Sequence, residues 1–261
     1  MARRTQGPVP GGGRRHVNPI PRHHIHREEH TVHRDFVFEA AGERLAATTI
    51  TGGEETEPDI LALHGLGPTA TRHRTRYLLD ELAEHGHSSL TFEFSGNGES
   101  TGELTRSTLR RRRAETLAAA GRLDRTRPPV IIGTSMGAHL AAWTVPELRP
   151  RGLALFCPAT YPAHAADLPF DGSLVRPAYH PDSPAYAALR QFEGDLLIFG
   201  ARQDEVCPPE VIEGYHAHAR RARSVEIVWL EGCGHFVHDW LPGQESLRQQ
   251  AVQRLLRLLA T

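Results

Sequence analysis

The stretch VIIGTSMGAHLAAW, residues 130–143, joins an apolar run of strand length to a segment of small residues that can form a helix. At its centre is a G-x-S-x-G pattern, in which Ser135 lies between Gly133 and Gly137. A sharp strand-to-helix turn leaves no room for side chains beside a strained serine, which accounts for both glycines. Because about 0.1 chance matches are expected in a chain of this composition, the surrounding segments must distinguish a nucleophile from an ordinary helix N-cap serine.

On both sides of this turn, apolar runs of strand length alternate with longer amphipathic segments. The expected strands cover residues 59–65, 88–94, 129–133, 152–157, 195–200 and 225–230, and the expected helices lie near residues 72–86, 105–126, 136–148, 208–222 and 244–260. Continuously apolar strands are buried on both faces, and strand–helix alternation gives right-handed crossovers in a parallel sheet. Residues 35–50 predict an antiparallel hairpin around Gly42. The fold class is therefore α/β: a doubly wound, mostly parallel sheet with an antiparallel N-terminal hairpin.

The composition indicates one folded domain and an N-terminal tail. A chain of 261 residues that is 39% hydrophobic can bury one large core. Residues 1–33 are rich in Gly, Pro, Arg and His and have no apolar periodicity, so we expect a flexible or loosely packed tail before a domain at 34–261. The spacing of its histidines matches no zinc-binding pattern, and we expect no metal site there. These histidines are His23, His24, His26, His30 and His33.

Charge and cysteine content exclude several classes of partner. Thirty basic and thirty-one acidic residues leave a formal net charge of −1, which predicts neither nucleic-acid nor anionic-membrane binding and favours a small-molecule substrate. No apolar run is long enough for a transmembrane helix, and residues 1–30 have no signal-peptide core. Three scattered cysteines without a C-x-x-C pair favour a reducing, cytoplasmic location and buried free thiols over a disulfide between Cys207 and Cys233.

Ser135 follows a buried strand, and ligands of such sheets bind beyond the carboxyl ends of the strands. A serine hydroxyl needs a base to accept its proton and a third group to hold that base. His235 follows the last expected strand and Asp204 the one before it, so the chain order is Ser135, Asp204, His235. Glu205 and Asp239 remain alternative acids. His238 is a less favoured base, because it lies toward the following helix.

Five segments together resemble the alpha/beta-hydrolase superfamily over about residues 35–260. They are LHGLG (63–67), FSGNGES (94–100), GTSMG (133–137), DEVCP (204–208) and GCGHF (232–236). The backbone N–H of Met136, after the nucleophile, is one expected oxyanion donor, and the resemblance implies the N–H of Leu66 as the other. His64 is expected to order its turn by hydrogen bonding rather than to act in catalysis.

The resemblance also places a short lid at about residues 158–194. Its aromatic side chains, together with Leu66 and Met136, predict an apolar wall for an uncharged apolar or aromatic acyl group. The alternative is that these aromatics only pack against the scaffold. They are Tyr161, Phe170, Tyr179 and Tyr186.

These observations predict a serine hydrolase that cleaves a carboxylic ester or thioester through an acyl-enzyme, without a metal or organic cofactor. Two alternatives remain open: an acyltransferase or cyclase that uses the same three residues with an acceptor other than water, and a non-catalytic ligand-binding module. The arginine run Arg110–Arg113 is either a solvated helix face or a docking site for an acidic acyl-carrier protein or coenzyme A phosphates.

Overall fold

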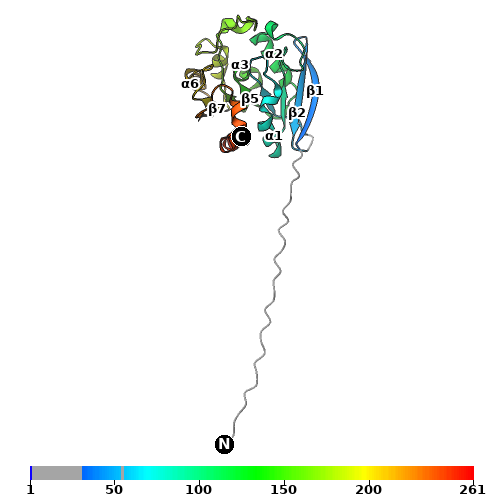
Figure 1. The fold of residues 1–261 in the computed structure, drawn as a ribbon, viewed down its shortest axis with the longest axis vertical. Helices are drawn as coiled ribbons and strands as arrows, with labels where there is room; N and C mark the ends of the chain where they lie inside the picture. The colour runs from blue at the N-terminus through cyan, green and yellow to red at the C-terminus, as the bar shows by residue number, and fades with distance from the viewer. Residues whose placement is uncertain (2–30, 54–55) are drawn as a thin grey trace.

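A computed structural model describes residues 1, 31–53 and 56–261 of the chain. They form one eight-stranded sheet in the order β1-β2-β4-β3-β5-β6-β7-β8, antiparallel at β1–β2 and β2–β4 and parallel from β4 to β8. The strands are β1 (Val32–Ala40), β2 (Glu43–Thr51), β3 (Ile60–Leu63), β4 (Ser89–Phe92), β5 (Val130–Thr134), β6 (Gly152–Phe156), β7 (Asp195–Ala201) and β8 (Ser224–Leu230). This arrangement confirms the predicted α/β class and the antiparallel start (Figure 1).

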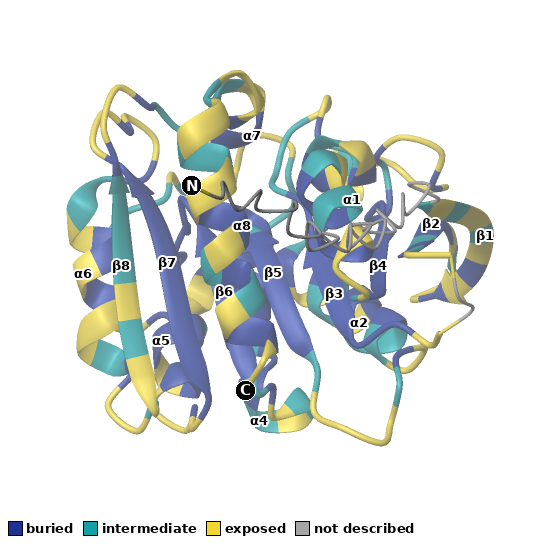
Figure 2. Cartoon of the chain, turned by 90° about the horizontal axis from the view of Figure 1, so that it is seen from below, coloured by how far each residue is buried: buried dark blue, intermediate teal, exposed yellow. Residues whose placement is uncertain are grey.

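Helices cover both faces of the sheet because its central strands are apolar on both sides. The helices are α1 (Arg76–Glu84), α2 (Leu109–Ala120), α3 (Met136–Trp143), α4 (Val145–Leu148), α5 (Pro184–Leu189), α6 (Pro209–His218), α7 (Val237–Trp240) and α8 (Glu245–Leu259), with short 3-10 turns at η1 (Arg72–Thr75), η2 (Leu104–Arg106), η3 (Ala163–Asp167) and η4 (Leu241–Gly243). One core cluster joins α1 and α8 to the sheet, and a second joins α2, α3, α5 and α6 to its other face. Figure 2 shows the buried strands β5, β6 and β7 with α8 in front of them.

Several boundaries differ from the sequence expectation for local reasons. The helix expected over 136–148 is two helices, because Pro146 cannot donate a backbone hydrogen bond and the Thr144 hydroxyl bonds to the carbonyls of Leu140 and Ala141. The expected helix at 105–126 is shorter, since Thr108 caps α2 by accepting from the Arg111 amide at 3.1 Å.

Most of the expected tail, including His23, His24, His26 and His30, lies outside the described residues. Strand β1 already begins at Val32, so His33 belongs to the sheet, where its Nε2 lies 2.7 Å from Asp80 Oδ1. None of the helices in the described ranges is both long and apolar enough to span a membrane.

Candidate active site

The turn from β5 into α3 holds Ser135 in a strained backbone conformation. Its φ is 51° and its ψ is −114°, values that a residue with a side chain rarely adopts. A Cβ on Gly133 would lie 2.6 Å from the Ala138 Cα, and one on Gly137 would lie 2.4 Å from the Leu63 carbonyl oxygen. Both positions therefore require glycine, as the sequence pattern predicts, and the turn presents Ser135 beyond the carboxyl end of the sheet.

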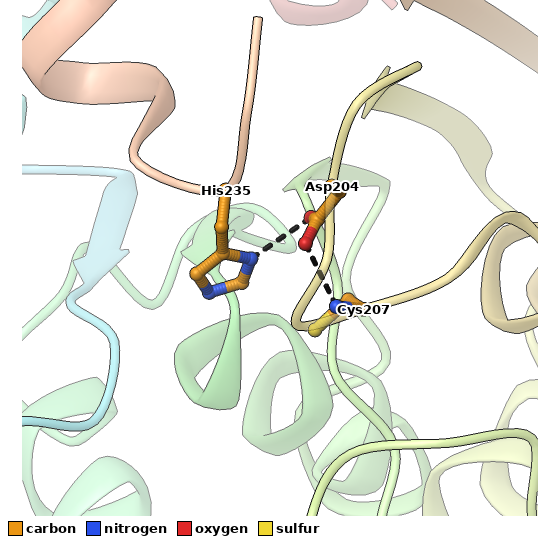
Figure 3. Close-up of side chains that lie close together, drawn as sticks. All are labelled: Asp204, Cys207 and His235. Carbon is orange, nitrogen blue, oxygen red and sulfur yellow. Dashed lines mark hydrogen bonds and ion pairs between the residues drawn. The ribbon is translucent and has the colours of Figure 1, made fainter.

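The three residues singled out in the sequence meet in one hydrogen-bonded line. His235 Nε2 lies 3.0 Å from Ser135 Oγ, and His235 Nδ1 lies 2.8 Å from Asp204 Oδ2. Figure 3 shows the Asp204 carboxylate facing the imidazole from the neighbouring loop. With Nδ1–H donating to Asp204, Nε2 is left with a lone pair that can accept the Ser135 proton. This is the geometry that a serine nucleophile, its base and an orienting acid require.

The loops that carry Asp204 and His235 lie side by side. The Gln203 amide donates to the Cys233 carbonyl at 3.2 Å, which joins the loop after β7 to the loop after β8. Asp204 Oδ1 accepts two backbone N–H bonds, from Val206 and Cys207, both at 2.8 Å. One carboxylate oxygen thus fixes the acid in its own loop, and the other is left for His235.

The alternative acids and base lie elsewhere. Asp239 forms an ion pair with Arg74 at 2.8 Å, and Glu205 is exposed. His238 is buried in α7, where its Nε2 lies 2.7 Å from the Thr134 hydroxyl and its Nδ1 lies 3.0 Å from the Tyr77 hydroxyl. Burial lowers the pKa of His238 to about 3, so the ring is neutral and joins elements of the scaffold.

The two segments expected to donate to an oxyanion flank Ser135. Met136 is the first residue of α3, where a backbone N–H has no acceptor within the helix. The loop after β3 passes beside Ser135, since a Cβ on Gly65 would lie 3.4 Å from Ser135 Cβ, and Leu66 is the next residue. The side chain of Met136 is buried and that of Leu66 is partly buried.

His64 orders this loop from within. Its Nδ1 lies 2.7 Å from the Gly65 carbonyl oxygen, and its Nε2 lies 3.1 Å from the Phe94 amide, which donates to it. Burial lowers the pKa of His64 to about 3, and a neutral ring can donate at one nitrogen while accepting at the other. The expected ordering role of His64 agrees with these contacts.

A metal ion fits the site poorly, although Asp204, Cys207 and His235 each place one ligand atom within 4.8 Å of the others. Cysteine binds metal as a thiolate, whereas burial and the nearby Asp204 carboxylate raise the pKa of the Cys207 thiol. The carboxylate of Asp204 is already engaged by two amides and the imidazole. All three cysteines of the chain are free and buried.

Within the segment 158–194, α5 contacts α3 and α6, and η3 contacts α2, but the aromatic residues of the segment differ in their surroundings. Tyr161 and Tyr186 are buried, and the Tyr186 hydroxyl donates to the Val211 carbonyl at 2.8 Å. Tyr179 is exposed at the surface, and Phe170 packs against the Arg112 guanidinium. For Tyr161 and Tyr186 the structure therefore agrees with the alternative that they pack against the scaffold.

The arginine run is not a free basic face. Arg110 pairs with Asp167, Arg111 with Glu43 and Arg113 with Glu147, as ion pairs of 2.6, 2.9 and 2.6 Å. Arg112 is completely buried. Because each of the four side chains has partners within the chain, the contacts give no support to the alternative that this run docks an acidic partner, and the burial of Arg112 departs from the favoured expectation of a solvated helix face.

Two exposed apolar side chains that the sequence analysis did not single out flank the acid and the base. Phe236 is 66% exposed and follows His235, with its ring centroid 5.8 Å from the imidazole. Val206 is 41% exposed and lies two residues after Asp204. The available signal in the sequence was a large apolar residue close to each of the two expected catalytic residues, Asp204 and His235.

One family model matches part of the chain. The model of a family described as serine aminopeptidase, S33, matches residues 54–180, which include Leu66 and Ser135. No curated protein sequence is significantly similar to the chain.

Three solved structures share the fold. An alpha-beta serine hydrolase homologue from Coxiella burnetii is 21% identical, with a TM-score of 0.63 over 85% of this chain and 97% of its own. Est1E from Butyrivibrio proteoclasticus, solved with ferulic acid bound, is 17% identical, with a TM-score of 0.64 over 87% and 100%. A thioesterase domain from the curacin biosynthetic pathway is 15% identical, with a TM-score of 0.61 over 84% and 99%. At these identities the likeness establishes the fold.

Proposed function

We propose that this chain is a member of the alpha/beta-hydrolase superfamily and a serine hydrolase that cleaves a carboxylic ester or thioester through an acyl-enzyme intermediate. The observation that carries the proposal is the position of His235, whose two ring nitrogens lie 3.0 Å from Ser135 Oγ and 2.8 Å from Asp204 Oδ2. A hydroxyl, a base and an orienting carboxylate in contact are the minimum for nucleophilic acyl transfer.

In the first half-reaction, Ser135 Oγ attacks the carbonyl carbon while His235 Nε2 takes the hydroxyl proton. The carbonyl oxygen becomes an oxyanion, to which the backbone N–H groups of Leu66 and Met136 donate. Collapse of the tetrahedral intermediate breaks the bond to the leaving alcohol or thiol, and His235 returns the proton to that group. Asp204 stabilises the imidazolium throughout, because its carboxylate accepts from Nδ1.

In the second half-reaction, water replaces the leaving group. His235 takes a proton from water as its oxygen attacks the acyl-enzyme, and then gives it to Ser135 Oγ as the acid is released. The exposed side chains of Phe236 and Val206 and the partly buried Leu66 offer apolar surface around this centre. They favour an uncharged apolar or aromatic acyl group, which binds by burial of its surface.

An amide is the second candidate substrate, because the family model that matches residues 54–180 is described as a serine aminopeptidase. The same residues would act, with His235 protonating a leaving amine in place of an alcohol. We favour ester and thioester substrates because the proteins that share the fold include Est1E, solved with ferulic acid bound, and a thioesterase domain.

The test is labelling with a fluorophosphonate, followed by turnover of p-nitrophenyl esters, acyl thioesters and aminoacyl p-nitroanilides. We expect one label on Ser135, and Ser135→Ala should lose both the label and turnover by a factor on the order of 10⁴ to 10⁶. Ser183→Ala is the matched control, because Ser183 is also a buried serine.

Labelling at another serine, or full turnover by Ser135→Ala, would contradict the proposal. Absence of any serine label on the folded protein would favour a binding module, because a fluorophosphonate reacts only with an activated serine. Product formation only when an alcohol or amine acceptor is added would favour a transferase.

A further inference from the structure

Arg112 is a buried cation. Within the described residues, its guanidinium forms no ion pair with a carboxylate. Its side chain is completely buried, and its guanidinium nitrogens donate to neutral oxygens: Asn97 Oδ1 at 2.7 Å, Ser107 Oγ at 3.3 Å and the Ser95 carbonyl at 3.4 Å. Burial lowers the pKa of Arg112 to about 10, which still leaves it charged at neutral pH. Moving a charge from water into the protein interior is unfavourable unless hydrogen bonds or ion pairs replace its hydration.

Asn97 extends this contact to the loop after β3. Its Nδ2 donates to the carbonyl oxygens of Gly67 and Ala70, at 2.8 and 3.1 Å, while its Oδ1 accepts from Arg112. Gly67 directly follows Leu66, whose backbone N–H is one of the two expected oxyanion donors. One buried amide therefore connects the guanidinium to the backbone that carries this donor.

The same guanidinium reaches the segment of the other donor. Arg112 Nη1 lies 3.6 Å from Met136 Sδ, and Met136 supplies the second expected N–H. The rings of Phe94 and Phe170 lie against the guanidinium, with centroids at 5.0 and 4.9 Å, and shield it from water. Arg112 is thus in contact with Met136 itself and, through Asn97, with the loop of Leu66.

We infer that Arg112 is a positioning residue for the oxyanion hole, which sets the separation of the Leu66 and Met136 N–H groups through Asn97 and the Met136 side chain. The inference rests on the proposed function, because it assigns a task to Arg112 only if an oxyanion forms there. The role requires the planar guanidinium group of arginine, because its three nitrogens donate in fixed directions to Ser107, the Met136 sulfur and Asn97.

Two substitutions interrupt the connection at different points. Arg112→Met keeps an apolar chain of similar length and removes the whole guanidinium. Asn97→Asp replaces the N–H donor to Gly67 and Ala70 by an acceptor. It keeps an oxygen for Arg112, so it interrupts the connection without leaving the buried guanidinium unpaired. Arg112→Lys retains the positive charge but lacks the planar guanidinium group. Arg110→Met is the matched control on the same helix, because the ion pair that Arg110 forms within the described residues is exposed and joins it to Asp167.

The readouts are kcat per fluorophosphonate-titrated site, KM, and the affinity for a trifluoromethyl ketone, which forms an anionic tetrahedral adduct with a serine nucleophile. Misplacing or losing one donor costs on the order of 10² in rate. We expect Arg112→Met and Asn97→Asp to lower kcat about 10- to 100-fold and ketone affinity by a similar factor, with KM within about threefold. Arg112→Lys should fall between Arg112→Met and the unaltered protein.

A purely structural role would lower the number of titratable sites but not kcat per site. Unchanged kcat per site and unchanged ketone affinity in both Arg112→Met and Asn97→Asp would overturn the inference while leaving the hydrolase assignment intact. Failure of the unaltered protein to react with the fluorophosphonate would instead overturn the proposed function.

Discussion

Asp204 uses its two carboxylate oxygens for different partners: Oδ2 lies 2.8 Å from His235 Nδ1, and Oδ1 accepts the amides of Val206 and Cys207. The loop after β7 therefore determines which oxygen faces the imidazole. This division of contacts makes the orientation of a substituted side chain at position 204 predictable.

Asp204→Asn should lower kcat by a factor on the order of 10³ to 10⁴. The backbone amides require an oxygen at the Oδ1 position, so the new NH₂ group must face His235 Nδ1. That nitrogen then becomes the acceptor, and the proton moves to Nε2, which can no longer take one from Ser135. Steady-state kinetics with a p-nitrophenyl ester measure the loss.

Glu205→Gln is the matched control for that substitution and should change kcat by less than about twofold, because Glu205 is exposed. A comparable loss in both variants would mean that the acid is misassigned.

Gly137→Ala should abolish turnover and destabilise the protein by several kcal/mol, on the order of 3. The added Cβ would lie 2.4 Å from the Leu63 carbonyl oxygen and 2.6 Å from that of His64, so the loop toward Leu66 must move. Gly243→Ala is the control, because nothing lies within 4 Å of its added Cβ. Urea denaturation and ester turnover test both, and equal behaviour of the two variants would refute the steric argument.

Phe236→Ser should lower kcat/KM for aromatic and long-chain acyl esters by about three- to tenfold and leave acetyl esters nearly unchanged. Its ring is 66% exposed beside His235, so a bound acyl group can bury it. Val37→Ser, which alters an exposed apolar residue of β1, is the control. An equal loss for all chain lengths would show that Phe236 supports His235 rather than the acyl group.

Three buried histidines make the stability of the fold sensitive to acid. The pKa values of His64, His139 and His238 are each lowered to about 3, mainly by burial. Below pH 6.5 the unfolded chain binds protons that the folded chain does not take up until about pH 3. The free energy of unfolding therefore falls across this window, by about 2 kcal/mol for each histidine between pH 7 and pH 5.

His139→Leu should reduce this acid sensitivity. Within the described residues, neither ring nitrogen of His139 has a hydrogen-bond partner, and the ring packs against Tyr161 and Trp143. We expect the variant to lose about 2 kcal/mol less than the unaltered protein between pH 7 and pH 5, as measured by urea unfolding. The exposed His164→Gln is the control, and identical pH profiles for His139→Leu and the unaltered protein would contradict the prediction.

The sheet could be predicted from the sequence because its central strands are continuously apolar and alternate with helices. The turn at Ser135 could also be identified from the sequence, because Gly133 and Gly137 occupy positions where a Cβ has no room. The assignment between Asp204 and Glu205 could not be settled by pattern alone, since the residues are adjacent and only the turn that bonds Oδ1 to two amides decides which one faces inward.

The burial of Arg112 could not be predicted from the sequence pattern. Leu109, Arg112, Thr116 and Ala119 share one face of α2, and all four are buried. Their helical spacing was visible, but a run of four arginines is typical of a solvated face, and no local rule predicts that one of them enters the core. Its burial depends on Asn97 and the rings of Phe94 and Phe170, which are distant in sequence.

The backbone of Ser135 has a consequence for the evolution of this chain. A φ of 51° costs a residue with a side chain about 1–3 kcal/mol, whereas glycine adopts it freely. Ser135→Gly should therefore unfold at a higher urea concentration than the unaltered protein while losing turnover. Selection for stability alone would replace this serine, so its retention would reflect selection for a reaction that the more stable sequence cannot perform.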